Sequence, residues 1–193
     1  MPTVREQLVT DINNCRGATL ALREVSRKIF VLDPTYAFKD DRILGFKILN
    51  SIAERFRVPL GCVKIAGSAQ TGFSSFKDRD FVFGESDLDV AIVSPSLFQR
   101  YCEIVYDITN GYLNFTKFDD KNSQERFQGN LQLGFFRPDL MPNSKEKTEW
   151  FTFFNSLTDR YSAVFKSVNG GIYFSERFFE GKQLPALEKL IRV

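Results

Sequence analysis

The sequence predicts an α/β (α+β) fold, in which a small mixed sheet is flanked by helices and preceded by a helical N-terminal segment. The prediction depends on two short apolar runs, at 61–66 and 88–93. Apolar residues have helical spacing before the run at 61–66 and again after the run at 88–93. A chain of 193 residues has the usual size of one domain. We therefore expect a single domain over 1–193, with a helical segment at 1–57 and a core at 58–193.

Apolar residues recur every three or four positions through the N-terminal segment, which is the spacing of one helical face. These residues are Val4, Leu8, Ile12, Leu22, Val25, Ile29, Ile43, Phe46, Leu49 and Ile52. Pro34 interrupts the pattern, because proline lacks an amide proton and disfavours helix in the residue before it. The segment is therefore expected to contain two or three helices.

The two short apolar runs have the composition of buried strands. The run at 61–66 ends at Gly67, and the run at 88–93 is apolar at all but one position. Pro95 suits the first turn of a helix that continues to about residue 107. Polar residues therefore stand at the ends of both predicted strands.

The pattern is more ambiguous in the C-terminal half. Residues 114–134 suit either a helix closed by Gly134 or a strand near their end, and we favour the helix. A last helix is expected to be broken near Pro185. The other elements expected are a loop at 137–142, a helix at 145–165, a turn at 169–171 and a strand at 172–174.

Composition limits the partners and the chemistry. The chain holds 26 Lys and Arg against 24 Asp and Glu, and the net charge of +2 is too small to indicate an extensive duplex nucleic-acid surface. Histidine is absent, which excludes histidine-containing hydrolase triads, histidine-ligated zinc sites and imidazole base catalysis. Any general base must therefore be another residue type.

Targeting signals are not evident. The first residues lack a cationic flank followed by an apolar stretch, and no run approaches the roughly 18 uninterrupted apolar residues of a membrane span. The 3 cysteines are widely spaced and fit neither a disulfide framework nor a paired metal or redox motif. We therefore expect a cytoplasmic protein with no membrane contact.

Two carboxylates stand one residue apart at the start of the second predicted strand. Side chains alternate along a strand, so Asp87 and Asp89 point to the same side. Like charges this close repel each other unless a cation lies between them, and carboxylate oxygens select hard cations. The pair therefore predicts a metal site for Mg²⁺ or Mn²⁺, ions that also bridge to substrate phosphates.

A polar loop follows the first predicted strand. Gly67 permits close approach of the backbone to a ligand, and Ser68 adds a hydroxyl that can donate to a phosphate oxygen. Thr71 and Gly72 continue this loop, and Ser86 directly precedes the carboxylate pair. We predict that these five residues bind a nucleotide.

The segment between the loop and the carboxylates carries Lys77 and Arg79. Both are typical of solvated loop charges, and contact with a triphosphate is the second interpretation for each.

These residues resemble the signature of the DNA polymerase β-like nucleotidyltransferase superfamily. That signature is a hydrophobic residue followed by Gly-Ser, a variable gap and an Asp-hydrophobe-Asp strand, and it is matched by Ala66-Gly67-Ser68 and by residues 86–93. The resemblance covers about residues 61–95. The gap here exceeds that of compact members, which implies an inserted loop.

The resemblance implies a polymerase β-like fold and a metal-dependent transfer of a nucleotidyl group from a nucleoside triphosphate. Asp87 and Asp89 would be catalytic residues that hold the metal, and the Gly-Ser loop would hold the triphosphate. The resemblance also implies a third carboxylate, on a later strand, that acts on the acceptor hydroxyl. Asp139 is our first candidate for this acid and Glu176 is the second.

The superfamily includes enzymes with different acceptors. We favour a second nucleotide, as in bacterial antiviral defence signal synthases, because a chain without a broad basic surface is poorly suited to long duplexes. The alternatives are a protein hydroxyl, as in AMP-adding antitoxins, and a catalytically degenerate nucleotide-binding module. The expected partners are a nucleoside triphosphate and a protein partner or effector.

Overall fold

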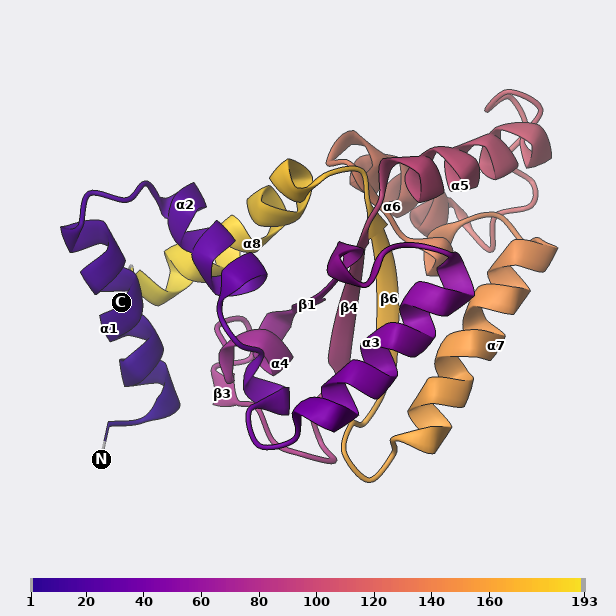
Figure 1. Cartoon of the computed structure of the whole chain (residues 1–193). Coiled ribbons are helices and arrows are strands. Elements are labelled where there is room, and N and C mark those ends of the chain that lie inside the picture. The colour runs from indigo at the N-terminus through magenta and orange to yellow at the C-terminus, as the bar shows by residue number, and fades with distance from the viewer. Residues whose placement is uncertain (1, 192–193) are drawn as a thin grey trace.

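The computed structural model describes residues 2–191 and confirms a fold of mixed helix and strand (Figure 1). Its main sheet has the order β1-β4-β6-β5, in which β4 and β6 are parallel and the other neighbours are antiparallel. The strands of this sheet are β1 (Val63–Ala66), β4 (Leu88–Val93), β5 (Phe135–Phe136) and β6 (Val168–Tyr173). The prediction of a small mixed sheet flanked by helices is therefore confirmed.

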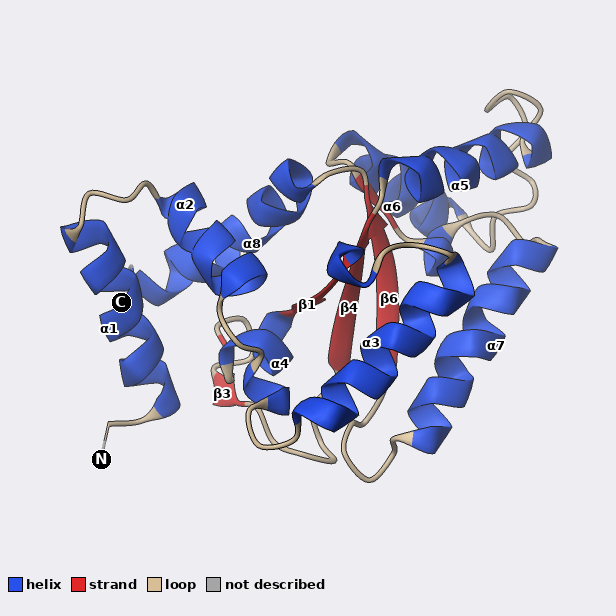
Figure 2. Ribbon diagram, in the orientation of Figure 1, coloured by secondary structure: helices blue, strands red, loops and turns tan. Residues whose placement is uncertain are grey.

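Helices make up most of the rest of the fold (Figure 2). They are α1 (Val4–Gly17), α2 (Leu22–Arg27), α3 (Arg42–Phe56), α4 (Gly67–Thr71), α5 (Pro95–Ile108), α6 (Lys121–Gln132), α7 (Lys145–Arg160) and α8 (Glu176–Ile191). A π-helical turn spans Lys28–Leu32, and 3₁₀ turns span Tyr36–Phe38, Leu60–Cys62 and Pro138–Leu140. The N-terminal segment is helical as predicted, with Pro34 in the break before α3.

A small hairpin occupies the inserted loop that the long gap implied. It pairs β2 (Phe73–Ser74) with β3 (Arg79–Asp80) and stands apart from the main sheet.

The sheet buries a different set of helices on each face, because side chains alternate along a strand. Leu88, Val90 and Ile92 of β4 belong to a cluster with core residues of α3 and α7. Ala91 and Val93 belong to a second cluster with residues of α1, α2 and α8. β4 is therefore covered on both faces over most of its length.

Aromatic side chains join α3 to α7, which lie side by side across the first face in Figure 1. The ring of Phe56 lies 4.8 Å from Trp150, 5.6 Å from Phe153 and 6.1 Å from Phe154, measured between centroids. Such ring pairs add to the stabilisation from apolar burial.

On the second face, α2 and α8 are joined by an ion pair whose carboxylate is buried. Glu180 is only 1% exposed, and its carboxylate accepts from Nε of Arg27 at 2.6 Å. The hydroxyl of Ser26 donates to the backbone oxygen of Glu180 at 3.0 Å. A buried carboxylate needs such partners, so these contacts fix α8 against the N-terminal helices.

The prediction of a turn at 169–171 is wrong, because these residues lie inside β6. The two glycines are required by packing against aromatic rings. A Cβ at Gly170 would lie 2.2 Å from Cζ of Phe154, and one at Gly171 would lie 2.4 Å from Cε2 of Phe135. A Gly-Gly pair resembles a turn in the sequence, but here it provides space for rings on both faces of a central strand.

Other boundaries also differ from the prediction. Residues 61–62 belong to a 3₁₀ turn before β1, and α7 ends at Arg160. Residues 121–132 form the favoured helix, with Gly134 at φ +61° before β5. The expected break near Pro185 is wrong, because α8 continues through it with buried residues on both sides.

No helix within residues 2–191 combines the length and the apolar character required to cross a membrane.

We predict that Gly170→Ala lowers the free energy of unfolding by about 1–3 kcal/mol, because the added methyl group overpacks against Phe154. The measurement is urea denaturation. The matched control is Gly129→Ala in α6, where an added Cβ meets nothing within 4 Å. In a Phe154→Leu background, Gly170→Ala should lower the free energy of unfolding by less than in the parent. An equal decrease in both backgrounds would contradict this account.

Candidate functional site

The pairing of β1 with β4 brings the two halves of the sequence motif together. Ala66 pairs with Asp89 across the two strands, so the chain leaves β1 at Gly67 beside the carboxylate pair. A Cβ at Gly67 would lie 3.1 Å from Oδ2 of Asp89, and the φ of Gly67 is +63°. Both the close approach and the left-handed backbone require glycine here.

Asp87 directly precedes β4 and is held by two neighbours. The hydroxyl of Ser167 donates to its Oδ1 at 2.9 Å, and Nζ of Lys77 lies 3.5 Å from its Oδ2. Lys77 comes from the turn between β2 and β3. Of the two predicted cations in this segment, Lys77 therefore reaches the carboxylates, while Arg79 lies exposed on β3.

The two carboxylates affect each other electrostatically. The pKa of Asp89 is raised, first by desolvation from the surrounding protein and then by the negative charge of Asp87. A hydrogen bond with Asn169 and the charges of Lys77 and Arg137 partly oppose this rise. The side chain of Asp89 is nevertheless exposed and accessible to a ligand. A cation placed between the carboxylates would relieve the repulsion.

Two other predicted nucleotide-binding residues, Ser86 and Thr71, form hydrogen bonds within the protein. The buried hydroxyl of Ser86 accepts from the backbone nitrogen of Val82 at 3.0 Å and stabilises its own loop. The hydroxyl of Thr71 donates to the backbone oxygen of Phe73 at 2.8 Å. These two side chains therefore bond to the protein backbone.

Gly72 and Ser68 differ in their surroundings. A Cβ at Gly72 would lie 2.7 Å from both Tyr36 and Val4, so this glycine is required by packing. Ser68 lines a small cavity next to Gly67. Thr71 lines the same cavity, but its hydroxyl already donates to the backbone oxygen of Phe73. Gly67 and Ser68 are therefore the predicted loop residues with the fewest competing contacts.

The two candidates for a third carboxylate do not join the pair. Asp139 forms a two-pronged ion pair with Arg137, with Nε of Arg137 3.0 Å from Oδ1. Glu176 begins α8, beyond the end of β6 that lies away from Asp89. Within residues 2–191 no group of three acidic or thiol side chains is placed to hold a metal.

Sequence reasoning missed Asn169, which lies opposite Asp89 in the parallel pairing of β4 and β6. Its Nδ2 donates to Oγ of Ser167 at 2.8 Å, and Ser167 in turn donates to Asp87. Asn169 therefore contacts both carboxylates, directly or through one hydroxyl. If the Gly-Gly pair had been predicted as part of a strand, that strand would have placed Asn169 beside Asp89.

Arg137 and Lys182 were also missed. Arg137 directly follows β5, and its charge influences both Asp89 of β4 and Lys182 of α8. Lys182 lines the same cavity as Gly67 and Ser68. No local motif marks either residue, since both are brought in by distant elements.

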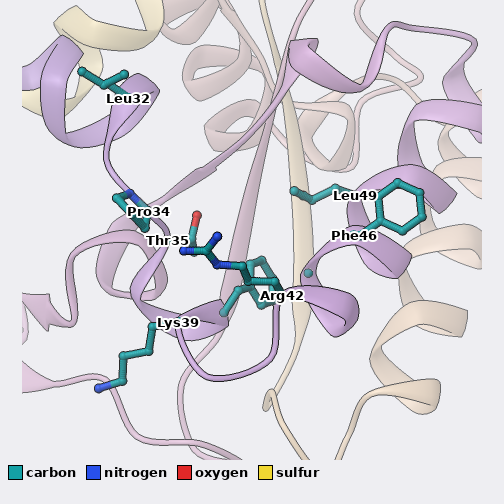
Figure 3. A pocket seen from close by; sticks show the side chains of 9 residues that line it. Leu32, Pro34, Thr35, Lys39, Arg42, Phe46 and Leu49 are labelled. Atoms are coloured by element: carbon teal, nitrogen blue, oxygen red, sulfur yellow. The ribbon is translucent and has the colours of Figure 1, made fainter.

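A separate pocket of about 330 Å³ lies between α3 and the segment before it (Figure 3). Its lining is largely apolar, with Leu32, Pro34, Phe46 and Leu49, and Arg42 points into it. None of its lining residues is acidic. It is therefore distinct from the carboxylate site.

No protein-family model matches this chain, and no solved structure matches it. A function is therefore inferred from the residues at the edge of the sheet.

We predict that Gly67→Val weakens binding of a Mn²⁺ nucleoside triphosphate, because the side chain strains the left-handed backbone and crowds Asp89. Titration calorimetry measures the affinity. Gly61→Ala is the control, since an added Cβ there meets nothing within 4 Å. Unchanged affinity in a folded Gly67→Val variant would disprove the role of this loop.

We predict that Asp89→Asn raises the free energy of unfolding at pH 7 without divalent metal. The folded state raises the pKa of Asp89, so ionisation costs more in the folded than in the unfolded chain. This penalty is complete above the folded pKa and vanishes below the unfolded value of about 3.9. The difference in free energy of unfolding between Asp89→Asn and the parent should therefore disappear near pH 3, about one unit below the unfolded pKa.

Urea denaturation at several pH values tests this expectation, with Asp80→Asn on exposed β3 as the control. Added Mn²⁺ should narrow the difference, because metal binding stabilises the parent. A parent that is more stable than Asp89→Asn at pH 7 without metal would contradict the prediction.

Proposed function

We propose that this chain is a metal-dependent nucleotidyltransferase that transfers a nucleotidyl group from a nucleoside triphosphate to an acceptor hydroxyl and releases pyrophosphate. The close approach of Gly67 to Asp89 supports the proposal most. A Cβ built on Gly67 would lie only 3.1 Å from Oδ2 of Asp89. The Gly-Ser loop and the pair of carboxylates thus share one edge of the sheet, which supports the arrangement that the resemblance to polymerase β-like enzymes implies.

The donor set fits Mg²⁺ or Mn²⁺. Asp87 and Asp89 offer hard oxygen ligands, and the pKa of Asp89 is raised first by desolvation and then by the negative charge of Asp87. Magnesium is commonly bound through one or two carboxylates together with substrate phosphates, so a pair is sufficient. When bound, such a metal would supply stabilisation of negative charge on the phosphate oxygens.

The residues around the pair would orient it. Ser167 donates to one oxygen of Asp87 and is itself fixed by Asn169, so the rotamer of Asp87 is constrained before a ligand arrives. Lys77 is exposed beside the other oxygen and could turn toward a phosphate. These contacts position the site, and a preorganised site reduces the cost of binding.

A second function, a nucleotide-binding module without transfer, is favoured by one observation. The neighbour of Asp89 on β6 is Asn169, and an amide cannot accept a proton as a carboxylate base does. A metal and a triphosphate could then bind without activation of an acceptor. The two functions share one binding site and differ in turnover.

The acceptor that we favour remains a second nucleotide, with a protein hydroxyl as the alternative. Both lead to the same first assay, in which labelled nucleoside triphosphates are incubated with the protein and Mg²⁺ or Mn²⁺. Separation of small-molecule, protein-linked and oligonucleotide products then identifies the acceptor class. A protein partner or effector is added in a second arm.

We predict that Asp87→Asn and Asp89→Asn each reduce transfer by at least about 100-fold, because loss of metal stabilisation costs several kcal/mol in the transition state. Asp80→Asn should leave transfer unchanged. Asp139→Asn and Glu176→Gln test the two predicted bases in the same assay. Full activity in a folded Asp87→Asn, Asp89→Asn double variant would exclude the proposed site.

Asn169→Asp separates the two functions. If the parent binds a metal nucleotide but transfers nothing, the introduced carboxylate should produce transfer, because a positioned base contributes about 10²–10⁴-fold. Asn169→Leu is the control for loss of the hydrogen bond to Ser167. Transfer by the parent itself would instead show that the chain does not need an acid at this position.

A further inference from the structure

The pocket between α3 and the segment before it is lined along one side by a single face of α3. Arg42, Phe46 and Leu49 follow each other at helical spacing, so their side chains share this face over about two turns. Gly45 lies on the same face, and a Cβ there would lie 2.8 Å from the buried ring of Phe38, which also lines the pocket. The pocket is therefore a groove that follows α3 for about 10 Å.

Apolar side chains on both sides of this groove are exposed to solvent. Leu32 is 78% exposed and Phe46 is 55% exposed, and Figure 3 shows them on opposite sides. Leu32 ends the π-helical turn, and such turns are rare and are frequent at functional sites. Large apolar side chains that stay exposed around a hollow with a polar rim are typical of a surface that a partner covers.

The charge of the groove is positive. Arg42 and Lys39 are the charged residues that line it, and in the described part of the chain neither forms an ion pair within 4.0 Å. Nζ of Lys39 lies 4.2 Å from the centroid of the Tyr36 ring, whereas the guanidinium of Arg42 lies between the apolar walls in Figure 3. The carboxylate of Asp41 accepts from the backbone nitrogen of Leu44 at 2.9 Å and does not line the groove. Arg42 is therefore available to a carboxylate from a partner.

The size and the composition of the groove restrict the ligand. Its volume of about 330 Å³ is at the low end for small-molecule sites, which enclose most of their ligand. Here side chains of both walls are exposed, so a small molecule would keep much of its surface in water. Duplex phosphates require a wider basic surface than two cations between apolar walls. Apolar side chains of another protein, with an acid beside them, complement both features.

We propose that this groove binds an amphipathic helix of a protein partner, whose apolar face contacts Leu32, Phe46 and Leu49 and whose carboxylate pairs with Arg42. A helix presents apolar residues at the spacing that fits a groove along two turns of α3. The pairing with Arg42 orients the helix, because its acid must lie at the end of the groove where α3 begins. The inference is independent of the proposed transfer, since none of these residues belongs to the carboxylate site.

Peptide display tests this inference without a known partner. The library holds helical peptides of about 14 residues, a length at which helices begin to be populated in water, and varies leucine, serine, glutamate and lysine at most positions. Selection on the parent protein should enrich peptides that combine leucines at helical spacing with a glutamate. Fluorescence anisotropy then measures affinity, and Phe46→Ser and Arg42→Glu should each weaken binding at least about tenfold. Arg42→Glu should instead prefer the same peptide with lysine in place of glutamate.

The controls are matched in charge and in apolar character. Lys47→Glu makes the same charge change on α3 outside the groove, and Leu113→Ser removes an apolar side chain that is 80% exposed elsewhere. Both should leave the affinity unchanged, and urea denaturation verifies that every variant is folded.

Three outcomes would overturn the inference. The first is a library that yields no binder, and the second is a set of enriched peptides that lack an acid or bind the parent, Phe46→Ser and Arg42→Glu equally. The third is a parent dimer, measured by sedimentation, that Phe46→Ser dissociates, because the groove would then bind a second copy of this chain.

Discussion

The antiparallel pairing of β1 with β4 is the constraint on which the candidate site depends. It places Ala66 opposite Asp89, so the chain must turn away at Gly67 within reach of a carboxylate. A side chain at Gly67 would meet Oδ2 of Asp89, and a shift of one residue in register would move Asp89 to the other face. The loop and the acids therefore act as one unit only in this register.

Packing around β6 maintains that unit. Gly170 and Gly171 leave room for rings on opposite faces, so β6 can lie directly against β4 while aromatic side chains cover it. Ser167 directly before this strand and Asn169 within it lie at the edge of the sheet, where they bond to Asp87 and to each other. The packing of rings against Gly170 and Gly171 thus fixes β6, and through it the polar groups of Ser167 and Asn169 at the start of the strand.

The charges of the site are arranged in two zones. Asp87 and Asp89 form an acidic pair, and the pKa of Asp89 is raised first by desolvation and then by the charge of Asp87. Lys182, from α8, lines a cavity without acidic residues that Gly67 also lines. A metal with a bound phosphate chain would complement both zones, because its cation matches the acids and its far end is anionic. The ion pair between Arg27 and the buried carboxylate of Glu180 supports this arrangement by fixing α8.

The sequence by itself determined the local parts of this protein. Helical spacing predicted the N-terminal helices and α5, and the spacing of Asp87 and Asp89 at a strand start predicted their proximity, because these features depend on neighbours in the chain. Only the tertiary structure decided the role of residues 168–173 and the neighbours of the acids. Gly-Gly was interpreted as a turn because the rings that require it come from α7 and β5. Asn169 and Lys182 reach the site through strand pairing and helix docking, which no local pattern encodes.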